Sequence, residues 1–143
     1  MTISLVEVAG ANFRTDDRSD RLNDEFMRRL GMRKRYLPAR LAISRSLAMV
    51  SPPETLGDDT EPGKAIKGDT LFGTGTALSV WLGLIVERSA DPELDLKKLI
   101  SLVGAHWRRG LAQLDKEWDQ AGQDLSKFVA RLVEVAELRT GRG

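Results

Sequence analysis

The sequence predicts a mainly α protein, a compact helical domain of about five helices that covers residues 1–143 as a single unit. Three observations favour this fold class. Apolar side chains recur every three or four residues in several segments, which is the spacing of a helix with one buried face. Residues that favour helix starts and stops stand at the ends of these segments. Finally, 143 residues with 41% apolar content are enough to bury a sizeable core.

Residues 1–12 form an N-terminal extension that we expect to begin with a strand. Ile3, Leu5 and Val8 lie in a short β-prone run that ends at Gly10. Because a single strand is not stable alone, this one has to pair with another strand, which a second subunit could provide.

Two helices joined by a basic turn are expected next. Thr15 is suited to cap a helix over residues 16–30, and Gly31 is suited to end it. Pro38 fits the first position of a second helix that runs to about Met49. The apolar positions of these two helices are Leu22, Phe26, Met27, Leu30, Leu37, Leu41, Ala42 and Leu47.

The remaining chain predicts one long loop and three more helices. Glycines, prolines and acidic residues over 51–70 indicate an irregular loop, and a loop of this length is normally functional or mobile. Residues 77–87 are apolar on nearly all sides, which is typical of a helix in the centre of a protein or at a subunit interface. A long amphipathic helix over 96–118 follows. After Gly122 a last helix leads to a polar tail, 139–143, that we expect to fray.

Charge is segregated along a chain whose net charge is only +1. Between Glu25 and Glu54 there are seven basic residues and no acidic ones, whereas residues 54–96 carry nine acidic and three basic side chains. A basic segment creates a local field that attracts polyanions, chiefly nucleic acid, and the acidic segment offers an opposite surface for self-association. The alternative interpretation is that the basic residues only solvate one helix face.

We expect DNA phosphates to contact the turn and the second helix, with the loop as a secondary contact. The candidate DNA-binding residues are Arg28, Arg29, Arg33, Lys34, Arg35, Arg40, Arg45, Lys64 and Lys67. Tyr36 directly follows the turn, where its ring could rest against a sugar or base, but packing over the turn is its favoured role.

The residue content excludes several functional classes. The chain has no cysteine, which rules out disulfides and thiolate metal sites and fits a cytoplasmic protein. His106 is the only histidine, and we expect it to pack or to hydrogen-bond rather than to bind a metal. The run Gly73-Thr74-Gly75 lacks the third glycine and the preceding strand of a dinucleotide fingerprint. No acid, base and nucleophile converge, so we expect no catalytic residue, no cofactor and no metal. The longest apolar stretch, 77–86, is too short to cross a membrane.

Several segments resemble the DndE family of DNA sulfur modification proteins, which belong to the phosphorothioation machinery. The segments are Phe13-Arg14-Thr15, Leu30-Gly31, the run from Leu37 to Leu47, the run from Gly68 to Gly73, and the run from His106 to Leu111. Together they span about residues 13–115, and their order carries more weight than any one of them.

The resemblance implies a small helical, non-catalytic protein that associates with itself as a tetramer. Such a protein binds double-stranded DNA, preferentially nicked, beside other sulfur-modification proteins that carry out sulfur transfer. The chain differs from the family pattern in having extra residues at both ends and in a basic patch made mostly of arginine. Because arginine binds phosphate with a bidentate fork, this difference concerns the detailed DNA footprint more than binding itself.

Two other functions stay open at this point. The order of strand, helix, basic turn and helix is similar to that of ribbon-helix-helix transcriptional regulators, although residues 3–8 present no base-reading face. The third function is that of a structural adaptor whose basic turn docks onto the acidic surface of a protein partner. Competition with unrelated duplexes distinguishes a regulator from a backbone binder. A gel shift with intact, nicked and single-stranded DNA identifies an adaptor.

Overall fold

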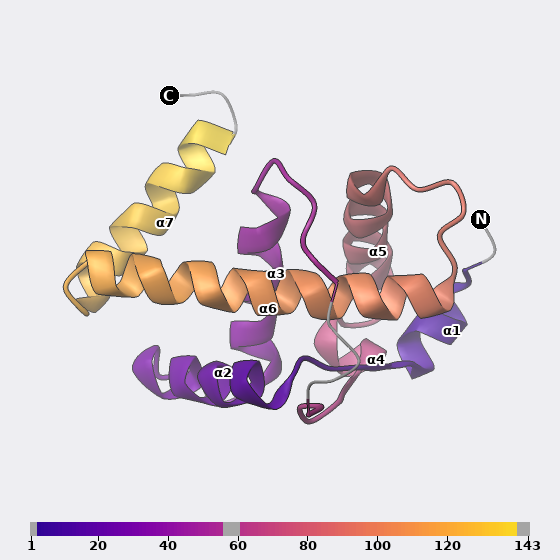
Figure 1. The fold of residues 1–143 in the computed structure, drawn as a ribbon, viewed down its shortest axis with the longest axis horizontal. Helices are drawn as coiled ribbons and strands as arrows, with labels where there is room; N and C mark the ends of the chain where they lie inside the picture. Colours follow the sequence, from indigo (N-terminus) through magenta and orange to yellow (C-terminus); the bar gives the residue numbers. More distant parts are fainter. Residues whose placement is uncertain (1–2, 56–60, 140–143) are drawn as a thin grey trace.

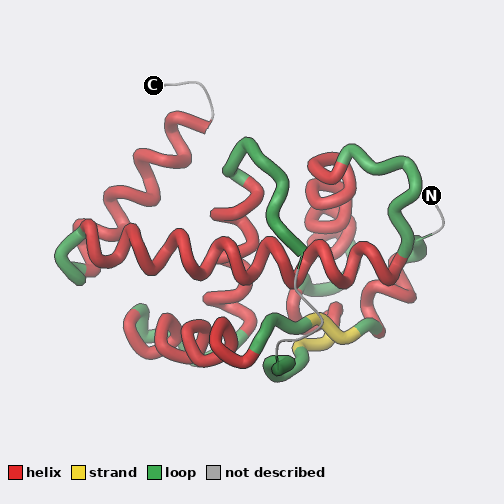
Figure 2. Tube along the Cα trace, in the orientation of Figure 1, coloured by secondary structure: helices red, strands yellow, loops and turns green. Residues whose placement is uncertain are grey.

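A computed structural model describes residues 3–55 and 61–139 and confirms the mainly α fold. The longest helix, α6, runs across the molecule; α3 crosses it, α2 lies along one side, and α7 projects from its C-terminal end (Figure 1). Helices account for most of the described chain, and two short strands form its only sheet (Figure 2). The elements are α1 (Leu5–Gly10), β1 (Asn12–Phe13), α2 (Asp17–Arg29), α3 (Tyr36–Leu47), β2 (Ile66–Lys67), α4 (Gly68–Leu71), α5 (Thr76–Ser89), α6 (Leu96–Gln120) and α7 (Leu125–Arg139).

The predicted N-terminal strand is wrong, because residues 5–10 form helix α1. The Ser4 hydroxyl accepts a hydrogen bond from the backbone N–H of Glu7 at 3.1 Å and donates one to the Glu7 carboxylate at 3.0 Å. This reciprocal arrangement satisfies a backbone N–H that has no partner within the helix and holds the first turn closed. A Ser-x-x-Glu pattern is a helix start signal, and here it prevails over the strand preference of Ile3 and Val8.

The next two helices occur close to the predicted bounds. Helix α2 is capped by Asp16 rather than by Thr15, since the Asp16 carboxylate accepts from the Ser19 N–H at 2.7 Å. Gly31 follows α2 with a φ of +64°, as expected for a residue that ends a helix. Helix α3 begins at Tyr36, two residues before Pro38, and the proline lies in the first turn, where its missing N–H costs no hydrogen bond.

The predicted loop over 51–70 is only partly irregular. Ile66 and Lys67 form β2, which pairs antiparallel with β1 in the register Phe13↔Ile66 and Asn12↔Lys67, and α4 follows at once. No local pattern indicates this pairing, because strands of two residues carry no periodicity. The rest of that loop (56–60) and most of the tail predicted to fray (140–143) lie outside the described residues.

The core is centred on the crossing of α3 and α6, where the two backbones touch. A Cβ atom placed on Gly110 of α6 would lie 1.7 Å from the carbonyl oxygen of Ala42 on α3. Only glycine permits such an approach, which brings buried Ile43 of α3 and buried Trp107 of α6 into one core. The indole N–H of Trp107 donates to the Asn23 side chain of α2 at 3.0 Å, so all three helices are tied together at this point.

Helix α5 is less buried in this chain than its sequence suggests. Only Leu78 and Ile85 are buried, whereas Val80 is 54% and Leu84 is 50% exposed. A central position of α5 in the single chain is therefore wrong. Within the described part of the chain, no helix combines the length and apolar character that a bilayer crossing requires.

Candidate nucleic-acid interface

The basic segment occupies the C-terminal end of α2, the following turn and helix α3. The structure divides the nine candidate DNA-binding residues into two groups by their surroundings. The exposed group consists of Arg28, Arg33, Lys34, Lys64 and Lys67. The partly buried group, whose members all contact other groups of the protein, consists of Arg29, Arg35, Arg40 and Arg45.

Arg35, one of the partly buried arginines, is bound by two carboxylates of α2. Its guanidinium donates to Asp20, and its Nε lies 3.4 Å from Asp24. The Asp20 side chain is itself only 8% exposed, so an unpaired charge here would be costly. Arg35 therefore fastens the start of α3 to α2, and its charge is already balanced within the chain.

Arg29 and Arg45 connect α2 and α3 to the C-terminal half of α6. Arg29 donates to Asp115 at 2.9 Å and to Glu25 at 3.0 Å, and its guanidinium packs over the Phe26 ring. Arg45 donates to both oxygens of Glu117, at 2.8 and 3.2 Å. The Arg45 and Glu117 side chains are only 14% and 3% exposed. The charges of Arg29 and Arg45, which were predicted to bind phosphate, are therefore paired with carboxylates within the chain.

Arg40 bonds to main-chain carbonyls instead of carboxylates. Its Nε donates to the Leu71 carbonyl at 2.6 Å and its Nη2 to the Thr70 carbonyl at 3.2 Å, which holds α4 against α3. The Tyr36 ring packs against the same guanidinium, 4.3 Å from its centre. Tyr36 thus packs within the protein, the role favoured from the sequence.

Three cations of the exposed group lie around the turn after α2. In the described residues Arg28, Arg33 and Lys34 have no ion-pair or hydrogen-bond partner for their side chains, and all three lie at the C-terminal end of α2 or in the turn after it. We call these three residues the turn cluster. Three adjacent positive charges with no counter-charge attract anions such as phosphates. The structure places these three predicted positions at the surface, and the sequence alone could not separate them from the paired arginines.

The two lysines of the loop lie near the other end of α2. The Gly63 N–H donates to the Thr15 carbonyl at 2.7 Å, which places Lys64 beside the start of α2. Lys64 has no partner among the described residues, whereas Lys67 lies 3.9 Å from Asp69.

A second polar site lies on the other side of α3 and was not predicted as a unit. His106 is buried at 2% exposure, and its Nδ1 lies 2.8 Å from the Ser46 hydroxyl. The same hydroxyl accepts a hydrogen bond from the Nε of Arg109 at 2.8 Å. This confirms that the histidine serves packing and hydrogen bonding, as expected. Its hydrogen-bond partner Ser46 lies 60 positions earlier in the sequence, so no local pattern could reveal this pair.

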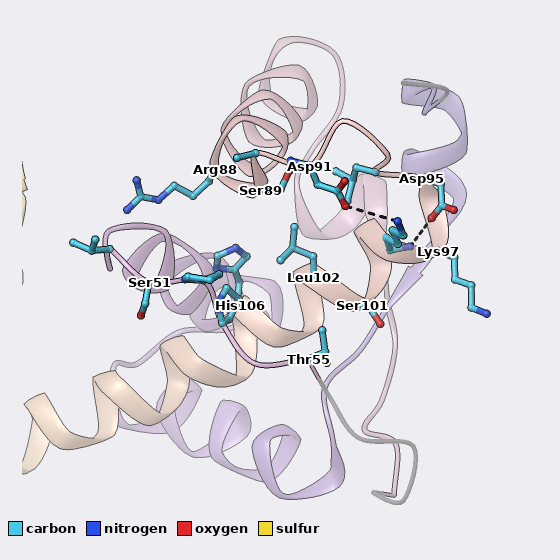
Figure 3. A pocket seen from close by; sticks show the side chains of 16 residues that line it. Ser51, Thr55, Arg88, Ser89, Asp91, Asp95, Lys97, Ser101, Leu102 and His106 are labelled. Atoms are coloured by element: carbon cyan, nitrogen blue, oxygen red, sulfur yellow. Dashed lines mark hydrogen bonds and ion pairs between the residues drawn. The ribbon is translucent and has the colours of Figure 1, made fainter.

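His106 lines a cavity of about 890 Å³ between α6, the end of α5 and the residues after α3 (Figure 3). Burial, together with the nearby charges of Arg109 and Arg88, lowers the pKa of His106 from 6.5 to about 4. Burial, followed by the charge of Arg88, also lowers the pKa of Arg109. The imidazole is therefore neutral at physiological pH.

The buried imidazole predicts a loss of stability in mild acid. The unfolded chain protonates His106 near pH 6.5 and the folded chain only near pH 4, so the unfolded state binds more protons between these values. Lowering the pH from 7.5 to 5 should cost about 2 kcal/mol of unfolding free energy from this one group. We expect urea titrations to show this loss in the wild type and a smaller loss in His106→Gln. Equal losses in both proteins would contradict the buried neutral histidine.

Comparison with known proteins adds one family match. A family model described as DNA sulphur modification protein DndE matches residues 13–121, which is more than half of the chain. The matched segment contains the turn cluster, the α3–α6 crossing and His106, whereas α7 follows it. No curated protein matches the chain.

Proposed function

The chain belongs to the DndE family of DNA sulphur modification proteins, and from this membership we propose that it is a non-catalytic, DNA-binding accessory subunit of a phosphorothioation system. It binds duplex DNA, preferentially nicked, beside the proteins that transfer sulfur. The observation that carries this proposal is the turn cluster, whose three cations have no partner among the described residues. Lys64 and Lys67 extend the contact toward the start of α2.

Binding through this surface would be electrostatic and nearly blind to sequence. Phosphate contacts fix affinity and orientation, whereas sequence is read at base edges. The ribbon-helix-helix alternative loses its basis because the segment that should form its strand is helix α1. An adaptor that docks onto an acidic protein remains distinguishable by experiment, since it would not shift DNA of any form.

Salt dependence tests the proposal directly. If an oligomer engages about six phosphates, its affinity for a duplex should fall on the order of 10³-fold between 50 and 200 mM salt, because binding releases condensed counterions. Fluorescence anisotropy with intact, nicked and single-stranded DNA of one sequence measures this slope and the preference among DNA forms. A flat salt response, or no binding at 50 mM salt, would reject the DNA-binding function.

Self-association through α5 is the second part of the proposal. The exposed Val80 and Leu84 border an apolar groove of about 740 Å³ against the end of α3, and an exposed face of this kind favours a protein interface. We expect the wild type to form an oligomer, a tetramer by analogy with the family resemblance.

Leu84→Glu should dissociate this oligomer, because it places a charge in an apolar contact. Ser79→Glu, an equal charge change at another exposed position of α5, should leave it intact. Light scattering gives the mass of each protein in solution. A monomeric wild type, or equal masses for the two variants, would remove α5 as the interface.

A further inference from the structure

The cavity beside His106 is built from three separate parts of the chain that are held in place by hydrogen bonds. Arg88 donates to the Met49 carbonyl at 2.6 Å, Arg108 to the Glu54 carbonyl at 3.1 Å, and Arg109 to the Ser51 carbonyl at 2.7 Å. These bonds fasten residues 49–54 to α5 and α6 from both sides. The wall of the cavity is therefore formed before any ligand arrives, which lowers the entropic cost of binding.

The hydrogen-bond chain at the base of the cavity favours one tautomer of His106. Because Arg109 can only donate, the Ser46 hydroxyl accepts from it and has its own proton left to donate. The Ser46 hydroxyl can give that proton to Nδ1 of His106, which lies 2.8 Å away and is unprotonated in this arrangement. The neutral ring then carries its proton on Nε2, which has no partner among the residues that the structure describes, and His106 lines the cavity. A hydrogen-bond donor is thus left for a ligand.

Two cations lie near this donor without an ion-pair partner in the described part of the chain. The hydrogen bonds that Arg88 and Arg109 make there go to carbonyl and hydroxyl oxygens, so no carboxylate among these residues pairs with either guanidinium. Two acidic residues also line the cavity: Asp95 caps α6 through the Lys98 N–H, and Asp91 lies 3.8 Å from the Lys98 ammonium (Figure 3). The described lining holds three basic side chains, Arg88, Lys97 and Lys98, against these two acidic ones, and this excess of positive charge favours an anion.

We propose that this cavity binds a phosphate monoester, with the phosphate between the Nε2–H of His106 and the guanidinium of Arg88. A phosphate oxygen accepts hydrogen bonds from both donors, and its negative charge relieves the repulsion between Arg88 and Arg109. The organic part lies against the apolar wall formed by Pro53, Leu94 and Leu102. A volume of about 890 Å³ is within the range of small-molecule sites, so it holds more than a bare phosphate ion. This site is separate from the turn cluster and does not depend on DNA binding.

His106 makes the site observable by NMR, because it is the only histidine in the chain. A long-range ¹H–¹⁵N spectrum of the imidazole should show the Nε2–H tautomer in the free protein. Titration with a nucleoside 5′-monophosphate should move the Nε2 signal in a saturable manner, and inorganic phosphate should move it in the same direction. The nucleoside without phosphate should leave it in place. An Nδ1–H tautomer, or no movement at millimolar monophosphate, overturns the proposal.

Calorimetry on variants then locates the phosphate. Arg88→Gln should weaken monophosphate binding about 10- to 100-fold, the usual effect of losing one charge-assisted hydrogen bond. Lys97→Gln removes an exposed charge from the same rim and should change the affinity less than about threefold. Ser101→Trp keeps every charge but fills the cavity, so it should abolish binding even if Arg88→Gln disturbs the loop. Unchanged binding in Ser101→Trp or in Arg88→Gln overturns the site.

Variants at the two sites distinguish monophosphate binding in the cavity from DNA binding at the turn cluster. Charge reversal in the turn cluster should leave monophosphate affinity unchanged, and Ser101→Trp should leave duplex affinity unchanged. Loss of monophosphate binding in the turn-cluster variant would instead place the phosphate on the DNA-binding surface and reject the cavity.

Discussion

Charge reversal of Arg33 and Lys34 is expected to abolish DNA binding while the helical fold stays intact. Both side chains are exposed and have no partner among the described residues, so their replacement by glutamate breaks no contact within the protein. The double variant changes the local charge by about four units and repels the phosphates that the wild type attracts. We expect affinity for a nicked duplex at low salt to fall by on the order of 10²-fold or more.

Arg35 is left out of this variant for a structural reason. Replacing it with glutamate would place a third carboxylate beside Asp20 and Asp24, and the resulting loss of binding could reflect unfolding. The matched control compares two single substitutions, Arg33→Glu and Lys97→Glu, which make the same change of charge at exposed positions. Anisotropy gives the affinities and circular dichroism the helix content. If Lys97→Glu weakens binding as much as Arg33→Glu, the turn cluster is not the DNA contact.

The largest effect on stability is expected for Gly110→Ala. The added methyl group would lie 1.7 Å from the Ala42 carbonyl oxygen and 2.3 Å from its carbon, both of which are backbone atoms that cannot rotate away. Helices α3 and α6 would have to move apart along the whole core. Overpacking of this kind typically costs about 1–3 kcal/mol, and we expect a value at or above the upper end because the obstacle is main chain.

Gly83→Ala provides the control with the opposite sign. Gly83 lies within α5, and a Cβ atom there meets no other atom within 4 Å. Alanine lowers the entropy of the unfolded chain and favours helix, so this variant should gain about 0.5–1 kcal/mol. Urea unfolding monitored by circular dichroism measures both variants. A Gly110→Ala protein as stable as the wild type would contradict the close backbone contact at the crossing.

Most of the architecture could be predicted from the sequence, because helical periodicity is a local property. The helices corresponding to α2, α3, α5, α6 and α7 were expected at nearly their observed positions. Helix α1 replaces the predicted strand because the Ser4–Glu7 capping pair outweighs the strand propensity of Ile3 and Val8. The pairing of β1 with β2 left no local trace and could not be predicted.

The candidate site was predicted only in part, because charge was counted along the sequence while ion pairs form in space. Arg29 pairs with Asp115 across 86 positions, and Arg45 pairs with Glu117 across 72. Both carboxylates belong to α6, far along the chain, so nothing in the basic segment indicates that its charges will be paired there. The same limit applies to Ser46, which reaches His106 only after α3 has packed onto α6.

Gly110 at the crossing also determines how helices α3 and α6 align with each other. If α3 slid along α6 by one residue, the side chain of Arg109 or Leu111 would have to occupy the space that Gly110 leaves empty. Neither side chain fits into that space, so other alignments of α3 on α6 are strongly disfavoured during folding. One missing side chain therefore favours a single register of α3 on α6, the register in which Arg45 meets Glu117.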